Sequence, residues 1–101
     1  MIYKAGETIT FVAFYTANGI AKTGLTDVTA HIYKIGSQDE PITASVTEVG
    51  AGLYYCTFIP QEDGAYVCVF STSDSTVDQK DLASIAFRGI AGVNESDKML
   101  L

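Results

Sequence analysis

The stretch from Glu62 to Phe70 constrains the fold of this chain more than any other part of it. It begins with acidic residues and Gly64, a composition typical of a tight turn. After the turn, Tyr66, Cys68 and Phe70 occupy every second position. Alternate residues of a β-strand point to the same face, so these three side chains are expected to lie together in a core. The stretch therefore predicts a turn followed by a half-buried strand.

Similar alternation of apolar residues recurs along the chain, and no segment holds the i, i+3, i+4, i+7 spacing of an amphipathic helix for long. Turn signals such as the Asn18-Gly19 pair separate the alternating runs. Short strands that follow one another every ~8–12 residues, with turn signals between them, indicate an all-β antiparallel sandwich. A closed barrel is the main alternative. About seven strands are predicted, over residues 1–4, 8–16, 28–33, 41–47, 53–59, 62–70 and 82–90.

The chain has 101 residues, which is enough for one domain with one core. We predict a sandwich over residues 1–91 and a C-terminal tail over residues 92–101. The strand over residues 8–16 carries apolar groups on both parities, so it is expected to be central or covered on its second face. The inward parity of the strands gives this candidate core: Ile9, Phe11, Val28, Ile32, Ile42, Val46, Tyr54, Phe58, Tyr66, Cys68, Phe70 and Ile85.

The charge of the chain argues against nucleic acid as a partner. Its formal net charge is −6, and an acidic surface repels a phosphate backbone. No apolar run approaches the ~20 residues that cross a membrane. No signal peptide opens the sequence, so we expect a protein that stays in a cytoplasm or leaves it by lysis or a dedicated route. The basic residues are scattered and form no stripe: Lys4, Lys22, Lys34, Lys80, Arg88 and Lys98.

The order acid-x-Gly-x-Tyr-x-Cys, made by Glu62, Gly64, Tyr66 and Cys68, resembles the corner and strand of immunoglobulin-like sandwiches. The resemblance implies that the hydroxyl of Tyr66 bonds to the backbone at the corner. It also implies that Cys68 lies in the core. We therefore predict an immunoglobulin-like sandwich in which these four residues form a structural corner.

The cysteines depart from the antibody pattern. The usual bridge joins the second strand to the sixth, but here the second strand offers Phe11 and Ala13, and the chain has no tryptophan. Cys56 and Cys68 both fall on inward parities, in strands that usually belong to different sheets. Buried free thiols are favoured because no secretion signal is present, and a bond between the two cysteines stays open as an alternative.

No residue set in the sequence predicts catalysis, a metal or a cofactor. His31 is the only histidine, lies on the outer parity of its strand, and has no nucleophile or acid assigned to it. Two cysteines and one histidine are too few for a structural zinc site. The acidic residues lack the alternating oxygen ligands of a calcium loop. Four tyrosines are expected to face outward, as in a contact surface or a sugar-binding platform: Tyr3, Tyr15, Tyr33 and Tyr55.

The chain also resembles the small immunoglobulin-like modules of tailed-bacteriophage structural proteins, over residues 5 to about 88. The resemblance implies a non-enzymatic virion component, a capsid decoration protein or a tail or fibre accessory, assembled in the host cytoplasm. It implies partners among other virion proteins in a homo- or hetero-oligomeric assembly. An adhesion or carbohydrate-binding module with a glycan partner is the alternative. The features that carry the resemblance are Ala5-Gly6-Glu7-Thr8, residues 20–26, residues 28–33, residues 48–54 with Phe58, and Asp63-Gly64-Ala65-Tyr66.

The C-terminal tail is polar except for its apolar end, Met99, Leu100 and Leu101. Burying such side chains yields roughly 1.5–3 kcal/mol each before the entropy of ordering the tail is subtracted. We therefore expect this end to contact another subunit, together with Tyr3 and Tyr33.

Overall fold

The computed structural model describes residues 2–84 and 86–88. Within these residues the chain forms strands, turns and loops and no helix. The strands are β1 (Ile9–Phe14), β2 (Thr16–Ala17), β3 (Ile20–Ala21), β4 (Thr29–Lys34), β5 (Ile42–Ala44), β6 (Thr47–Gly50), β7 (Leu53–Phe58), β8 (Tyr66–Ser71), β9 (Asp81–Ser84) and β10 (Ala86–Arg88).

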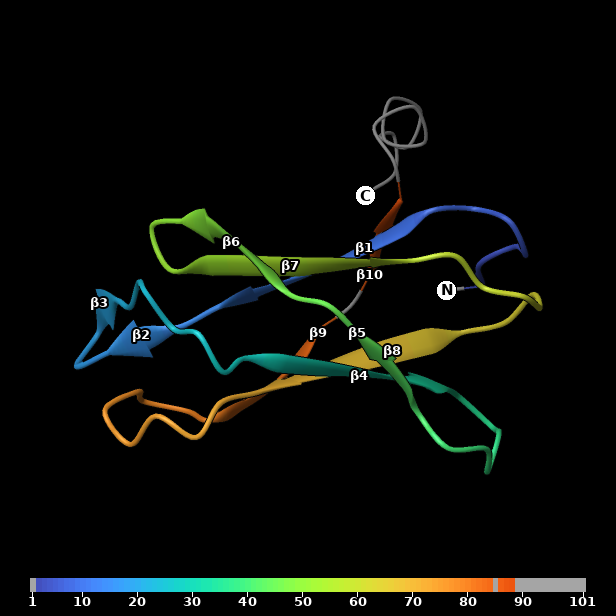
Figure 1. The fold of residues 1–101 in the computed structure, drawn as a ribbon. Coiled ribbons are helices and arrows are strands. Elements are labelled where there is room, and N and C mark those ends of the chain that lie inside the picture. The colour runs from blue at the N-terminus through green and yellow to red at the C-terminus, as the bar shows by residue number, and fades with distance from the viewer. Residues whose placement is uncertain (1, 85, 89–101) are drawn as a thin grey trace.

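The strands form two antiparallel sheets that pack face to face, with the short β2–β3 hairpin at one end (Figure 1). One sheet has the order β10-β1-β7-β6 and the other has the order β5-β4-β8-β9. The predicted all-β antiparallel sandwich is thus confirmed. β1, β7 and β6 take the places of immunoglobulin strands B, E and D, and β4, β8 and β9 take those of C, F and G. β10 pairs with β1 at the edge where strand A would lie.

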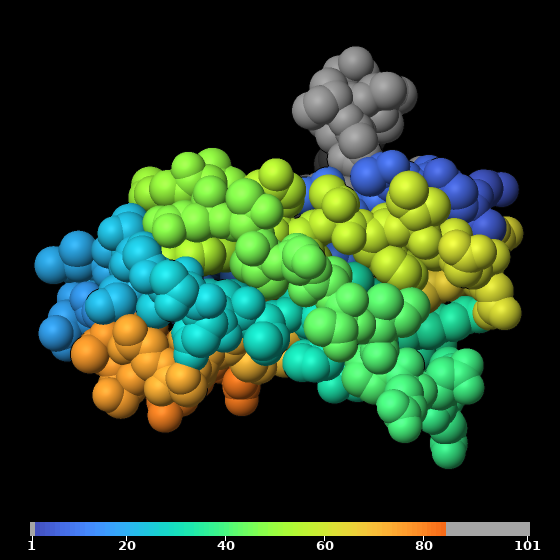
Figure 2. Space-filling view, in the orientation of Figure 1, coloured from blue at the N-terminus to red at the C-terminus, as the bar shows by residue number. Residues whose placement is uncertain are grey.

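The prediction of a single strand over residues 41–47 was wrong. β5 pairs with β4 in one sheet, whereas β6 pairs with β7 in the other. In the space-filling view, the green atoms of this segment run from the lower sheet to the upper sheet across the front of the molecule (Figure 2). A chain that crosses from one sheet to the other keeps one side toward the core. The alternation of apolar residues therefore continues across the crossing, and the sequence pattern does not reveal where β5 ends and β6 begins.

The predicted strand over residues 82–90 is also divided between the sheets. β9 pairs with β8, and β10 pairs with β1. Residues 1–4 do not form the expected leading strand; among the described residues, Tyr3 makes an isolated bridge to Gly64. These divisions and the β2–β3 hairpin explain why the described residues hold more and shorter strands than the sequence predicts.

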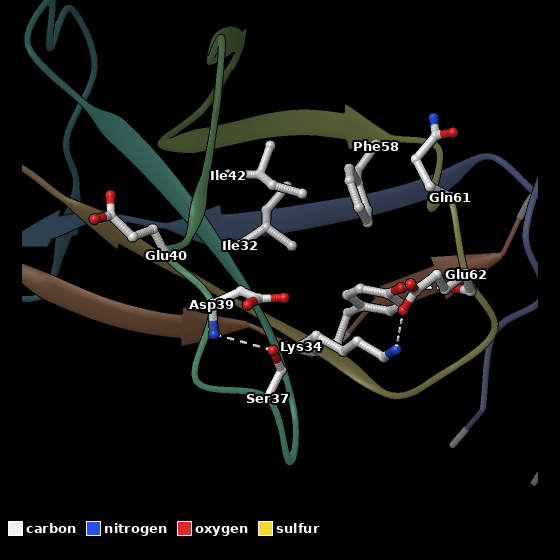
Figure 3. Close-up of a pocket in the computed structure, with 10 residues that line it drawn as sticks. Ile32, Lys34, Ser37, Asp39, Glu40, Ile42, Phe58, Gln61 and Glu62 are labelled. Carbon is white, nitrogen blue, oxygen red and sulfur yellow. Dashed lines mark hydrogen bonds and ion pairs between the residues drawn. The ribbon is translucent and has the colours of Figure 1, made fainter.

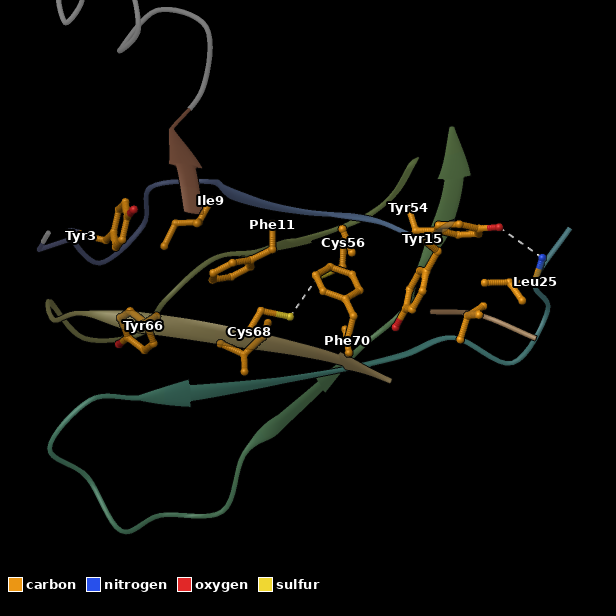
Figure 4. Packing of buried hydrophobic residues seen from close by; sticks show 14 residues of the cluster. Tyr3, Ile9, Phe11, Tyr15, Leu25, Tyr54, Cys56, Tyr66, Cys68 and Phe70 are labelled. Atoms are coloured by element: carbon orange, nitrogen blue, oxygen red, sulfur yellow. Dashed lines mark hydrogen bonds between the residues drawn. The ribbon is translucent and has the colours of Figure 1, made fainter. Parts of the chain in front are cut away.

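The core lies between the sheets, and its inward parities follow the prediction in β1, β4, β7 and β8 (Figure 4). Ile42 is the exception, with 47% of its surface exposed, because β5 is the edge strand of its sheet. Ile85 lies outside the described residues. Val28, Val46 and Phe58 are half-buried against the core. The remaining predicted core residues are buried: Ile9, Phe11, Ile32, Tyr54, Tyr66, Cys68 and Phe70.

Two of the four tyrosines that were expected to face outward are buried. Tyr3 is 3% exposed and Tyr15 is 1% exposed. Tyr15 shares the inward parity of Phe11, and its hydroxyl donates a hydrogen bond of 2.9 Å to the Lys80 carbonyl. Burial, followed by the charge of nearby Asp81, raises the pKa of Tyr15 to about 12. A tyrosine can thus face a core when its hydroxyl reaches a backbone acceptor at the rim.

Candidate protein-binding site

The predicted corner is a structural feature that connects β7 to β8. The hydroxyl of Tyr66 donates a hydrogen bond of 2.7 Å to the backbone carbonyl of Glu62, as the acid-x-Gly-x-Tyr pattern predicts. Glu62 also pairs with Lys34 of β4. Gly64 has no side chain, and a β-carbon there would lie 2.8 Å from Cε of Lys34. The corner therefore positions the two sheets and presents no group for chemistry.

The exposed side of the β10-β1-β7-β6 sheet carries the surface feature that the fold itself does not require. We define its outer apolar face as Val12, Phe14, Leu53 and Tyr55. Val12 of β1 lies directly opposite Tyr55 of β7, and Phe14 lies opposite Leu53. Phe14 is 52% exposed and Leu53 is 36% exposed, while the other two are half-buried. Cross-strand pairs of large apolar side chains thus point away from the core.

Two further exposed apolar residues lie on β6, which pairs with β7, and on the β2–β3 hairpin. Val49 of β6 is 63% exposed and Ile20 of β3 is 72% exposed. Gly52 lets the β2–β3 hairpin approach this sheet, because a β-carbon there would lie 3.0 Å from Cε1 of Phe14 and 3.1 Å from Cβ of Ala21. Exposed apolar patches of this kind mark contact sites more often than scattered single residues do.

The outer apolar face also lacks charge, although the chain carries a formal net charge of −6. The outward positions of β1 and β7 hold no Asp, Glu, Lys or Arg: they are Thr10, Val12, Phe14, Leu53, Tyr55 and Thr57. The outward positions of β4 and β8 in the other sheet also hold no Asp, Glu, Lys or Arg, but they include more polar side chains: Thr29, His31, Tyr33, Val67, Val69 and Ser71. Depletion of charge at the centre is the compositional mark of a protein interface.

A second candidate site is a cleft of about 170 Å³ between the β4–β5 turn and the end of β7 (Figure 3). Ile32, Ile42 and Phe58 line its apolar side, and the Lys34–Glu62 ion pair closes one side. The polar remainder of the lining includes Ser37, Asp39, Glu40 and Gln61. The volume of the cleft fits one small group, with apolar and polar neighbours in its lining.

The other acidic side chains with well-formed partners hold loops together. Asp78 accepts hydrogen bonds from the backbone nitrogens of Asn18 (2.8 Å) and Gly19 (3.0 Å) in the β2–β3 turn. The bond from Gly19 is the largest cause that lowers the pKa of Asp78. Asp27 accepts hydrogen bonds from Thr72 and Ser73, which lower its pKa to about 2. These carboxylates are therefore ionised structural acceptors.

Metal and membrane sites find no support in the part of the chain that the structure describes. Residues 2–84 and 86–88 contain no group of three or more His, Cys, Asp or Glu side chains placed to hold a metal ion. No helix among them is long and apolar enough to cross a membrane.

Of the residues predicted as subunit contacts, the structure describes Tyr3 and Tyr33. Tyr33 is 42% exposed on the outer side of β4, whereas Tyr3 is buried and is not available as a contact. Met99, Leu100 and Leu101 lie outside the described residues. Phe14 and Leu53 were missing from the predicted contacts, although the apolar second parity of the strand over residues 8–16 was a signal for this surface.

A scan against protein-family models found no family that matches this chain, and searches of curated proteins and of solved structures found no match either.

Proposed function

We propose that this protein is a non-enzymatic structural subunit of a tailed-bacteriophage virion, assembled in the host cytoplasm, which binds neighbouring subunits through its outer apolar face. The observation that carries the proposal is the pairing of exposed apolar side chains across β1 and β7, with no charge on the outward positions of either strand. The location in a virion, as a capsid decoration or tail accessory protein, rests on the sequence resemblance.

The size of the face indicates what a partner must cover. β1 and β7 have six residues each. Two neighbouring strands of that length span roughly 20 Å by 10 Å, or about 200 Å², and the outer apolar face lies within this area. A standard interface buries about 800 Å² on each partner. The outer apolar face can therefore be only the centre of an interface, and a partner must also cover the hairpin at Ile20 and the edge at Val49. We take a second copy of this chain as the partner. Its formal net charge of −6 makes two copies repel each other over most of their surfaces, so the uncharged outer apolar face is where that repulsion is weakest.

Self-association can be tested by sedimentation velocity over a range of concentrations. The double variant Phe14→Thr with Leu53→Thr removes apolar surface while it keeps residues that favour strands. We expect a concentration-dependent dimer of the parent, and a dissociation constant that is roughly tenfold or more higher for the double variant. The matched control is Val69→Thr, on the outer side of β8 in the other sheet, which should leave the dimer intact.

A parent that stays monomeric, or a double variant that associates like the parent, would overturn the role of the outer apolar face in self-association. The virion assignment has a separate test. We expect genes for capsid, portal or tail proteins beside the coding gene, and the chain itself in peptide maps of purified particles. Its absence from the particles would contradict that assignment.

The cleft favours a second candidate function, binding of a small ligand such as a glycan in an adhesion module. Its observation is that the ring of Phe58 lines the same cleft as Asp39, Glu40 and Gln61 (Figure 3). Tyrosines do not support this function, because Tyr33 lies on the sheet opposite to Tyr55. A glycan array distinguishes the two functions: binding that Gln61→Ala removes supports the module, and an array without binding contradicts it.

A further inference from the structure

The two cysteines of the chain meet between the sheets at the centre of the core. The Sγ atoms of Cys56 and Cys68 are 3.9 Å apart and share a hydrogen bond (Figure 4). Both thiols are free, and the two residues are 1% and 0% exposed. β7 and β8, which carry them, are inner strands of different sheets. The pair thus spans the sandwich at a point where each strand has neighbours on both sides.

The position of the pair corresponds closely to that of the bridge in antibody domains. In those domains the bridge joins strand B to strand F. Here the place of strand B is taken by β1, whose Phe11 is the direct cross-strand partner of Cys56. Cys68 lies on β8, in the place of strand F. The first sulfur is therefore displaced by one strand within the same sheet, and it still lies 3.9 Å from the Sγ atom of Cys68 in the other sheet.

We propose that Cys56 and Cys68 form a latent intersheet disulfide site, which hydrogen peroxide oxidises within the folded sandwich. The Sγ atoms must approach from 3.9 Å to the ~2.05 Å of a disulfide, by rotation of both side chains and a small shift of the strands. Both residues lie in one chain and face each other, so no second molecule is required. This inference is independent of the proposed function.

The chemistry can be written for these two thiols. The hydrogen bond with Cys68 lowers the pKa of Cys56, whereas the same bond and burial raise the pKa of Cys68. A thiolate at Cys56 is stabilised by the hydrogen bond that Cys68 can donate to it. This thiolate attacks one oxygen of the peroxide, an S–O bond forms, the O–O bond breaks, and hydroxide leaves. The hydroxide takes up the proton that Cys56 lost and becomes water.

In the second step, the sulfur of Cys68 attacks the sulfur of the Cys56 sulfenic acid. The S–S bond forms, the S–O bond breaks, and the departing hydroxyl leaves as water with the proton of Cys68. In sum, two thiols and one peroxide give one disulfide and two waters. Because both thiols are buried, peroxide must enter during local opening of the sandwich, so the reaction is expected to be slow. The bond stays open where thiols are kept reduced and closes after exposure to peroxide.

The test treats the folded protein with hydrogen peroxide and then alkylates it in denaturant. We expect an intact mass lower by two hydrogens, no alkylation of either cysteine, and complete reversal by dithiothreitol. Closing a loop between positions 12 apart should raise the Tm by roughly 10 °C or more. Cys68→Ala is the control, in which Cys56 has no partner and should not lose two hydrogens within one chain.

Three results would overturn the proposal, and all three are measured on the parent protein itself, so they do not depend on the folding of the variant. The first is thiols that still react with the alkylating reagent after peroxide treatment. The second is oxygen added to the sulfurs without a disulfide, and the third is a disulfide between two chains. A bridged protein with a lower Tm than the reduced protein would also overturn it, because the bridge would then not fit the folded sandwich.

Discussion

Replacement of Tyr66 by Phe isolates the contribution of the corner hydrogen bond to stability. The hydroxyl of Tyr66 is removed, while its ring keeps the edge-on contact with Phe58, whose centroid is 5.2 Å away at an interplanar angle of 63°. The cross-strand pairing of Tyr66 with Lys34 involves the backbone and is also kept. The substitution therefore removes one bond, of 2.7 Å to the Glu62 carbonyl, and little else.

The magnitude follows from the surroundings of the two atoms. The net contribution of an intramolecular hydrogen bond to the free energy of unfolding is about 0.5–1.5 kcal/mol. If its removal leaves the acceptor buried without a partner, the loss of stability rises to ~1–3 kcal/mol. Tyr66 is 9% exposed, but Glu62 is exposed, so water can reach the carbonyl after the change. We therefore expect a loss of about 1 kcal/mol. For a domain of this size, that loss corresponds to a decrease in Tm of roughly 4–8 °C.

The measurement is a thermal melt followed by circular dichroism, with urea unfolding as a second measure of the free energy. Tyr33→Phe is the matched control, since Tyr33 is 42% exposed and its substitution should leave the Tm unchanged. The variant should keep the native spectrum because the ring is retained. If Tyr66→Phe melts at the same temperature as the parent, the corner bond does not contribute to stability and the reasoning fails.

Two further predictions concern backbone strain and acid. Gly52→Ala should destabilise the fold by roughly 1–3 kcal/mol, because Gly52 has φ of +84° and a β-carbon there would lie 2.8 Å from the Tyr15 carbonyl oxygen. Gly36→Ala, at φ of +87° in open space, should cost less in urea unfolding, and equal costs would contradict the steric argument. Hydrogen bonds from Ser73 and Thr72 lower the pKa of Asp27 from 3.8 to about 2, so its contribution is present above pH ~4 and lost as the pH falls toward 2. The difference in urea midpoint between the parent and Asp27→Asn should shrink from pH 5 to pH 2.5, and a constant difference would argue against this linkage.

Much of the core could be predicted from the sequence because alternation is a local signal. In β8, the residues Tyr66, Cys68 and Phe70 are buried as their spacing predicts. The corner bond of Tyr66 likewise depends on residues a few positions apart. Local patterns of this kind need no knowledge of the partner strands. They fix which side of a strand faces the core, and they say nothing about which sheet the strand joins.

The changes of sheet at β5–β6 and β9–β10 could not be read from alternation. Ile42 falls on the apparent inward parity of its segment, but it lies on an edge strand and is 47% exposed. Tyr15 was misplaced for a different reason. It was expected to face outward, but it continues the inward alternation of Phe11 and Ala13, and its hydroxyl reaches the carbonyl of Lys80.

Two outward-facing positions of β1, Val12 and Phe14, are apolar although they do not point into the core. The sequence left two explanations for these apolar residues, a central strand or a covered second face. β1 does lie inside its sheet, between β10 and β7, but these neighbours bond to its edges. Among the described residues, its outer side includes the exposed Phe14. A central position in the sheet therefore does not explain why Phe14 is apolar and 52% exposed. Binding of a neighbouring subunit, as proposed above, supplies a physical reason for this side chain.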